Sequence, residues 1–174
     1  MRICLFVLIY MFVLMHTNLY AGCIKGNCKN GEGTYEHIDG SVYEGQHRDG
    51  KREGQGTYSY ANGTKYVGQF KNSNFDGRGV YTVPNGEKYE GEFKNGKRDG
   101  TGVLLYADGT KYTGQFQDNL LNGQGVVILP DGRRIEGQFR NHKLDDTGTL
   151  TYPDGRKEKV VQTGTNTFKI VLEK

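Results

Sequence analysis

Three cysteines and a few histidines are the residues of this chain best suited to covalent, acid–base or metal chemistry. Cys4 lies in an apolar N-terminal stretch, whereas Cys23 and Cys28 are five positions apart just after it. An even pair of cysteines in an oxidising compartment is typical of a disulfide, so we predict a Cys23–Cys28 bridge. Two cysteines without placed histidines fall short of the four ligands of a structural zinc site. We expect no metal and no cofactor.

No arrangement of residues indicates catalysis. His37, His47 and His142 are scattered, and no serine or cysteine stands in a recognisable nucleophile elbow. Gly-x-Gly recurs along the chain, but no Lys-Ser/Thr pair follows it as in a phosphate-binding loop. The net charge of +3 is too small to indicate a nucleic-acid partner. We therefore expect a protein that is neither an enzyme nor a nucleic-acid-binding protein.

The N-terminus has the composition of an export signal. Residues 3–15 form a 13-residue uninterrupted apolar run after a single arginine. A transmembrane helix needs about 20 such residues, whereas the hydrophobic region of a signal peptide needs only 7–15. We predict that residues 1–22 are a signal helix and that the protein is exported, to be secreted or held in the periplasm or cell envelope. An uncleaved membrane anchor is the other interpretation.

Two cleavage sites fit this leader. A conventional signal peptidase would cut after Ala21 or Gly22, whereas a bacterial lipoprotein would be cut before Cys23 and carry lipid on that residue. The residues before Cys23 are similar to a lipobox, although tyrosine stands where leucine is expected. Lipid on Cys23 would leave Cys28 as an odd free thiol, so the parity of the cysteines favours the disulfide.

The chain has an internal repeat with a period of 23 residues. Glycine accounts for 27 of 174 residues, beside 12 tyrosines and 8 phenylalanines. Glycine in pairs recurs at Gly31/Gly33, Gly54/Gly56, Gly77/Gly79, Gly100/Gly102 and Gly123/Gly125. A second motif, Tyr-x-Gly-x-Phe or a degenerate copy of it, supplies Tyr43, Gly45, Tyr66, Gly68, Phe70, Tyr89, Gly91, Phe93, Tyr112, Gly114, Phe116, Gly137 and Phe139. The glycines exclude a coiled coil, and the absence of a Gly-X-Y triplet excludes collagen.

These residues resemble the MORN (membrane occupation and recognition nexus) repeat family from about Gly31 to Gly155. The resemblance implies a solenoid of stacked hairpins, and the family spans lipid-binding, scaffolding and enzyme-appended roles. We expect an N-terminal cap and half-repeat at 23–42, five repeats at 43–157, and a C-terminal cap at 158–174 that ends in one strand. The fold class expected is all-β, as an elongated single-layer antiparallel sheet.

Each repeat reads as a β-hairpin. All three prolines fall at one repeat position, where a two-residue turn would need the N–H that proline lacks. We therefore predict a three-residue Pro84-Asn85-Gly86 loop with glycine in the left-handed conformation. This loop sets Tyr81 opposite Tyr89 and Gly79 opposite Gly91. We expect the glycine pair to leave a slot for a ring from the neighbouring hairpin.

Two sets of residues are candidates for interaction. Basic residues on the opposite face of the sheet, suited to anionic headgroups, are Lys65, Lys88, Lys111 and Arg134. Apolar residues between the repeats, suited to a partner or to packing against the next hairpin, are Phe75, Leu120 and Leu121. We expect an exported, non-catalytic scaffold or protein-interaction module, with homodimerisation through the aromatic face as one way to cover it. The alternative is a lipid-anchored envelope protein that binds membrane lipid or glycan.

Overall fold

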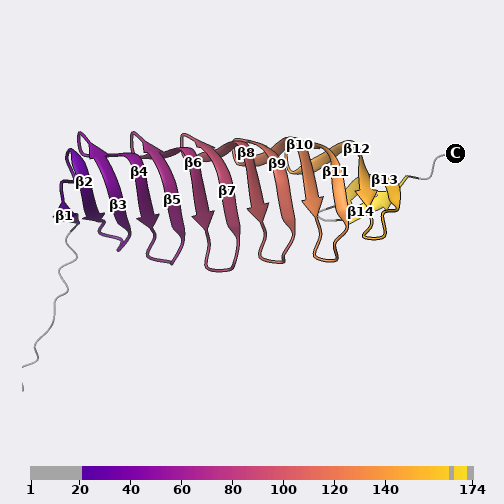
Figure 1. The fold of residues 1–174 in the computed structure, drawn as a ribbon, viewed down its shortest axis with the longest axis horizontal. Helices are drawn as coiled ribbons and strands as arrows, with labels where there is room; N and C mark the ends of the chain where they lie inside the picture. The colour runs from indigo at the N-terminus through magenta and orange to yellow at the C-terminus, as the bar shows by residue number, and fades with distance from the viewer. Residues whose placement is uncertain (1–20, 165–166, 172–174) are drawn as a thin grey trace, which may run out of the picture.

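The computed structural model describes residues 21–164 and 167–171, which form one open antiparallel sheet of fourteen strands paired in chain order (Figure 1). The strands are β1 (Gly22–Gly26), β2 (Gly31–Glu36), β3 (Val42–Arg48), β4 (Lys51–Ser59), β5 (Lys65–Lys71), β6 (Asn74–Thr82), β7 (Lys88–Lys94), β8 (Lys97–Leu105), β9 (Lys111–Gln117), β10 (Leu120–Ile128), β11 (Arg134–Arg140), β12 (Lys143–Thr151), β13 (Lys157–Gly164) and β14 (Thr167–Ile170). The elongated single-layer sheet is confirmed. The predicted signal helix lies almost wholly outside the described residues, and Gly22 at its end already belongs to β1.

The predicted hairpin loop is confirmed at the turn between β6 and β7. The Gly86 N–H donates to the Val83 carbonyl at 3.0 Å, and the Val83 N–H donates to the Glu87 carbonyl at 2.9 Å. Gly86 has a φ of +94°, which is the left-handed conformation expected of a glycine closing a type I turn with a bulge. The predicted register follows, because Tyr81 pairs with Tyr89 and Gly79 with Gly91.

A second, tighter turn joins each hairpin to the next. Between β7 and β8 only Asn95 and Gly96 intervene, both with positive φ, as a type I′ turn requires. The Gly96 N–H donates to the carbonyl of Phe75 in the preceding repeat at 2.8 Å. The same bond recurs from turn to turn along the sheet, so successive repeats are joined at this end by backbone hydrogen bonds as well as through the strands.

The tyrosines of the repeat lie in the predicted glycine slots. A Cβ on Gly79 would lie 2.5 Å from the Tyr66 ring, which belongs to the preceding hairpin, as expected. The slot is framed by Gly68 and Gly79, which pair across β5 and β6, rather than by the hairpin pair Gly79 and Gly91. Gly91 instead borders the slot of the next tyrosine, Tyr89. Each slot therefore spans the junction between two hairpins.

A β-bulge beside each slot was not foreseen from the sequence. Between the pairs Gly68–Gly79 and Phe70–Phe75 the register of β5 and β6 shifts, and Gly77 takes a φ of +98°. The Gln69 side chain provides a hydrogen-bond partner for the backbone at the bulge, since its Oε1 accepts the N–H of Arg78 at 2.7 Å. Gln46, Glu92 and Gln115 accept the equivalent N–H in other repeats. The first glycine of Gly-x-Gly thus adopts the positive φ of the bulge, and the second leaves room for the tyrosine ring in the slot.

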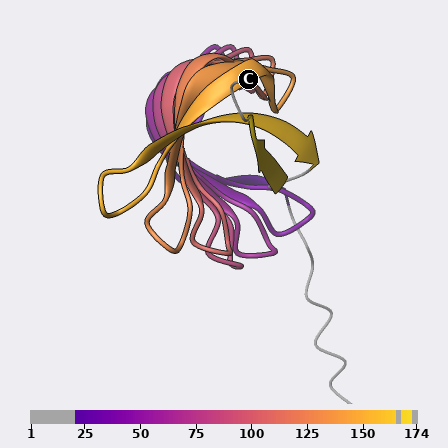
Figure 2. The same cartoon turned by 90° about the vertical axis from the view of Figure 1, so that its right-hand side faces the viewer.

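The bulges and glycines accompany a strong curvature of the sheet. Viewed along its long axis, the sheet is strongly bent, and β13 and β14 lie across the inside of the bend at the C-terminal end (Figure 2). Phe168 of β14 packs against the buried aromatic core, so the tyrosines lie on the inside of the curve. We call this side the aromatic face and the other side the opposite face. The predicted C-terminal cap therefore contains two strands instead of one.

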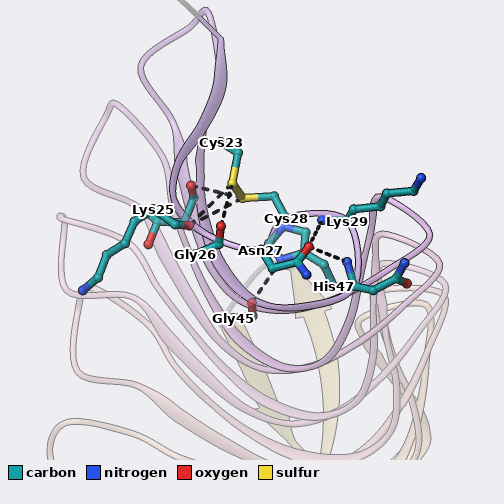
Figure 3. The surroundings of a disulfide bond; sticks show 10 residues. Cys23, Lys25, Gly26, Asn27, Cys28, Lys29, Gly45 and His47 are labelled. Carbon is teal, nitrogen blue, oxygen red and sulfur yellow. Dashed lines mark hydrogen bonds between the residues drawn. A yellow bond between two sulfur atoms is a disulfide. The ribbon is translucent and has the colours of Figure 1, made fainter.

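Other side chains replace tyrosine in the slots at the two ends of the array. Gly33 is the repeat equivalent of Gly79, and a Cβ on it would lie 2.8 Å from the Cys28 sulfur. At the other end, a Cβ on Gly137 would lie 2.5 Å from a methyl group of Leu144. The predicted Cys23–Cys28 disulfide is present, with 5.7 Å between the two Cα atoms (Figure 3). It closes the N-terminal slot.

Replacing both cysteines by serine is expected to loosen the first hairpin while leaving the centre of the sheet intact. The crosslink encloses few residues, and in the loop-entropy description a short loop contributes less than a long one. Hydrogen exchange should accelerate in β1 and β2, because the disulfide joins β1 to the turn between these two strands. It should remain unchanged in β8 and β9, which serve as the internal control. Equal protection of β1 and β2 in both proteins would contradict the capping role.

Candidate functional site: the aromatic face

A continuous aromatic ladder runs along the inside of the curve. The rings of Tyr66, Tyr89 and Tyr112 each contact the phenylalanine of their own strand and that of the next repeat, whereas Tyr43 contacts His47 in place of the first. For Tyr66 the two phenylalanines are Phe70 and Phe93, with ring centroids 5.1 Å away in both cases. Both pairs are edge-to-face, which is a favourable geometry for aromatic rings. The Tyr66 hydroxyl donates to the Gln69 carbonyl at 2.8 Å, so the polar end of the ring is also satisfied.

Burial raises the pKa of the slot tyrosines, chiefly because the phenolate would be desolvated. The pKa rises to about 12 for Tyr43, Tyr89 and Tyr112, and that of Tyr66 is raised further. The fold thus favours the neutral phenol relative to the unfolded chain, in which tyrosine has a pKa near 10. The contribution of these groups to stability is complete below about pH 10 and declines as the pH rises towards 12.

An alkaline unfolding transition is therefore expected. The melting temperature should be nearly constant between neutral pH and about pH 9, and should fall steeply above about pH 10. Ultraviolet absorbance of tyrosinate, recorded together with circular dichroism, tests this expectation. The slot tyrosines should ionise only as the sheet unfolds. Ionisation of all tyrosines in a sheet with an unchanged dichroism spectrum would contradict the burial described here.

A second row of aromatic side chains borders the ladder and is only partly covered. Tyr60, Tyr81 and Tyr106 are half-buried on the same face, as is Phe75, whose ring stacks on Tyr66 at 3.8 Å. Near the N-terminal end, Arg52, Tyr58, Tyr60 and Phe75 line a hollow of about 280 Å³. The Arg52 guanidinium lies 4.6 Å from the centroid of the Tyr58 ring. Tyrosine and arginine are the residue types enriched at the centres of protein interfaces.

The apolar candidates from the sequence lie in different environments. Leu121 is buried, with 4% of its surface exposed, and belongs to the core. Phe75 contacts the core but keeps part of its ring accessible, and Leu120 is half-buried at the start of β10. The structure therefore brings Phe75, but not Leu120 and Leu121, together with the partly exposed tyrosines. The sequence analysis did not include Arg52, whose recurrence two repeats later as Arg98 was the available signal.

The basic candidates form a row on the opposite face. Lys65, Lys88, Lys111 and Arg134 are all exposed, on alternate strands from β5 to β11. Two of the four lie beside a carboxylate on their own strand: Lys88 pairs with Glu90 at 2.9 Å, and Arg134 pairs with Glu136. Exposed pairs of this kind contribute little to stability. They do place a negative charge beside two of the four positive charges of the row.

The residues suited to acid–base or metal chemistry are not brought together. His37 lies beside Tyr35 and Tyr58, whereas His142 lies in a turn near the other end of the sheet. His47 takes the repeat position of the ladder phenylalanines, and its Nδ1 lies 3.1 Å from the Gly45 carbonyl oxygen. Within residues 21–164 and 167–171, no group of three or more His, Cys, Asp or Glu side chains could hold a metal ion. This part of the chain also contains no helix long and apolar enough to span a membrane.

Two solved structures are similar to this chain at low sequence identity. No curated protein gives a significant match. Among solved structures, the TCP domain of SAS-4 (dCPAP) of Drosophila melanogaster, in complex with a proline-rich motif of Ana2 (dSTIL), has a TM-score of 0.47 at 19% identity, over 76% of this chain and 79% of that chain. The G-box domain of the microcephaly protein CPAP has a TM-score of 0.44 at 19% identity, over 82% of this chain and 87% of that chain.

The family model of the MORN repeat matches most of the chain. The matched segments are residues 20–42, 43–65, 66–88, 89–111, 112–133 and 136–155. The first five units begin 23 residues apart, which is the period of the tyrosine slots and the paired turns, and the sixth begins at residue 136. The chain therefore belongs to the MORN repeat family.

Proposed function

We propose that this chain is an exported, non-catalytic interaction module that binds a partner protein through its aromatic face. The observation that carries the proposal is the row of half-buried aromatic side chains, Tyr60, Phe75, Tyr81 and Tyr106, on the inside of the curved sheet. A protein surface that groups aromatic residues in a concave strip is typical of an interface rather than of ordinary solvated surface. The slots and the ladder hold these side chains in fixed positions.

The export part of the proposal rests on the leader and on the cysteines. Disulfides persist in oxidising compartments, and Cys23, which pairs with Cys28, directly follows the predicted leader of residues 1–22. The same Cys23 sulfur is the atom to which a lipoprotein would attach its lipid. The bridge therefore supports a soluble exported protein over a lipid-anchored one. Intact mass of the protein from its native host tests this: the expected chain begins at Gly22 or Cys23 and gains two hydrogens on reduction, whereas added acyl mass would contradict it.

Substitutions on the two faces test the binding part. We expect the double variant Tyr60→Ala/Tyr106→Ala to weaken stoichiometric pull-down of the partner by about tenfold or more, since aromatic residues at interface centres contribute 2 kcal/mol or more. The triple variant Lys65→Glu/Lys88→Glu/Lys111→Glu is the matched control and should change the affinity less than about twofold.

The alternative functions make the opposite predictions. If the chain binds anionic lipid through the basic row, the triple charge reversal abolishes co-sedimentation with anionic vesicles and rising salt does the same. If a second copy of the chain covers the aromatic face, analytical ultracentrifugation finds a dimer that Tyr60→Ala/Tyr106→Ala dissociates. Either result would contradict a separate protein partner on the aromatic face.

A further inference from the structure

One position of the repeat differs systematically along the array. It follows the two-residue turn, lies on the aromatic face and recurs every 23 residues as Arg52, Phe75, Arg98, Leu121 and Leu144. Three of its five occupants are apolar and pack in or against the core. The fold therefore accepts an apolar side chain at this position. The two arginines are not required by the backbone or by the packing of the repeat.

Arg52 places a cation among aromatic rings without a carboxylate to neutralise it. It is half-buried, stacks over Tyr58 and donates from its Nη2 to the Ser73 carbonyl at 2.7 Å. The hollow beside it is lined by Tyr58, Tyr60, Ser73, Asn74, Phe75 and Gly96, so no acidic side chain contributes. Within the described part of the chain Arg52 has no ion pair, and its guanidinium keeps unused donors.

Arg98 lies in a related environment two repeats further along, where Leu104 takes the repeat position of Tyr58. Arg98 too is half-buried, lies 5.7 Å from the Tyr89 ring and donates to the Asn119 carbonyl at 3.4 Å, without an ion pair among residues 21–164 and 167–171. β4 and β8 are separated by four strand steps, or about 19 Å at about 4.8 Å a step. A peptide in the extended conformation covers this distance in about six residues.

The electrostatics nearby agree with unneutralised positive charge. The pKa of His37 is lowered by desolvation and then by the charge of Arg52, with Asp39 acting in the opposite direction. The pKa of His142 is lowered by desolvation and then by Arg98. Several exposed cations, by contrast, are paired, as Lys97 is with Asp118 at 2.7 Å and Arg156 with Asp154 at 2.8 Å. A partly desolvated cation gains most from a carboxylate brought by a ligand.

We propose that the partner presents an acidic extended segment, which lies across the strands on the aromatic face. Two of its carboxylates, about six residues apart, bond to Arg52 and Arg98. Apolar side chains between them lie against Phe75 and Tyr81, which occupy the intervening strand. The inference rests on the proposed function, because it names the chemistry of the partner for the same face.

The test uses a random peptide library, displayed on phage, selected against the mature disulfide-bonded chain. Selected peptides should be enriched in Asp and Glu at two positions about six residues apart. The variant Arg52→Phe/Arg98→Leu copies the residues that the chain already uses in the neighbouring repeats, so it should keep the fold. It should raise the dissociation constant of the selected peptides by about tenfold for each arginine.

Two further variants distinguish the effects of the positive charge, of guanidinium stacking and of the face on which the charge lies. Arg52→Lys/Arg98→Lys keeps the charge but loses the planar guanidinium, and should give an intermediate affinity. Lys65→Gln/Lys111→Gln removes the same charge from the opposite face and should change the affinity less than about twofold. Equal weakening by this control and by Arg52→Phe/Arg98→Leu would overturn the inference.

The failure of this inference is distinguishable from failure of the proposed function. The acidic-segment inference is wrong if selected peptides lack acidic residues, or if they bind Arg52→Phe/Arg98→Leu as tightly as the unsubstituted chain. If such peptides still lose affinity for Tyr60→Ala, the aromatic face remains the binding site. If the selection yields no peptide whose binding depends on Tyr60, Arg52 or Arg98, both proposals are wrong.

Discussion

Substitution of Gly68 by valine is expected to lower the free energy of unfolding by about 3 kcal/mol or more. A Cβ at this position would lie 2.5 Å from the Gly79 Cα, 2.6 Å from the Arg78 carbonyl oxygen and 2.7 Å from the Tyr66 hydroxyl. Two of these atoms belong to the backbone of the adjacent strand, so a rotation of one side chain cannot relieve the overlap. The strands must separate or the tyrosine must leave its slot, and either change disrupts the stacking between repeats. Chemical denaturation measures the effect.

Gly164 provides the matched control for this substitution. It also lies in a strand, but a Cβ there would meet its nearest atom at 3.6 Å, which is ordinary van der Waals contact. Gly164→Val should therefore change stability by less than about 0.5 kcal/mol. Similar unfolding midpoints for the Gly68→Val and unsubstituted proteins would contradict the slot as the element that joins the hairpins.

Replacement of Tyr89 by alanine should cost about 3–5 kcal/mol, because it empties a slot that the neighbouring glycines cannot fill. The Tyr89 ring is 1% exposed and lies 5.0 Å from the Phe93 ring and 4.9 Å from the Phe116 ring. Its removal therefore leaves a cavity at the junction of two hairpins. In a repeat array each unit is stabilised by its neighbours, so hydrogen exchange should accelerate most in β7, β8 and β9.

Tyr89→Phe separates the ring from its hydroxyl group. The hydroxyl donates to the Glu92 carbonyl at 2.9 Å, and its loss should cost only about 1 kcal/mol. A loss in Tyr89→Phe as large as that in Tyr89→Ala would indicate that the hydrogen bond, rather than the packing of the ring, holds the slot together.

The repeat, the three-residue turn and the pairing register could be predicted because each depends on local chemistry. Proline at one repeat position excluded the two-residue loop, and that loop length fixed Tyr81 opposite Tyr89. The tyrosine in the slot followed from the same register, since paired glycines leave room on one face only. The pair that frames the slot was assigned to the wrong strands, because the sequence alone does not show how closely the next hairpin approaches.

The bulges and the arginine position could not be predicted by the same reasoning. The spacing of Gly-x-Gly does not distinguish two cases. Both glycines could lie beside one slot, or, as observed, Gly77 could form a bulge while Gly79 borders the slot. The recurrence of Gln69 and its equivalents was the overlooked signal, since an amide at a fixed repeat position can accept a backbone N–H. Arg52 was not among the candidates, because the sequence alone does not show that its guanidinium lies over the Tyr58 ring.

Site-specific photo-crosslinking would test most directly whether the aromatic face binds the partner. A photoreactive phenylalanine analogue replaces Tyr60 on the aromatic face or, as the control, Val67, which is 45% exposed on the opposite face. The protein is irradiated in its native host. The account predicts one prominent crosslinked product from position 60 and none from position 67. Crosslinks from position 67 alone, or to lipid instead of protein, would contradict it.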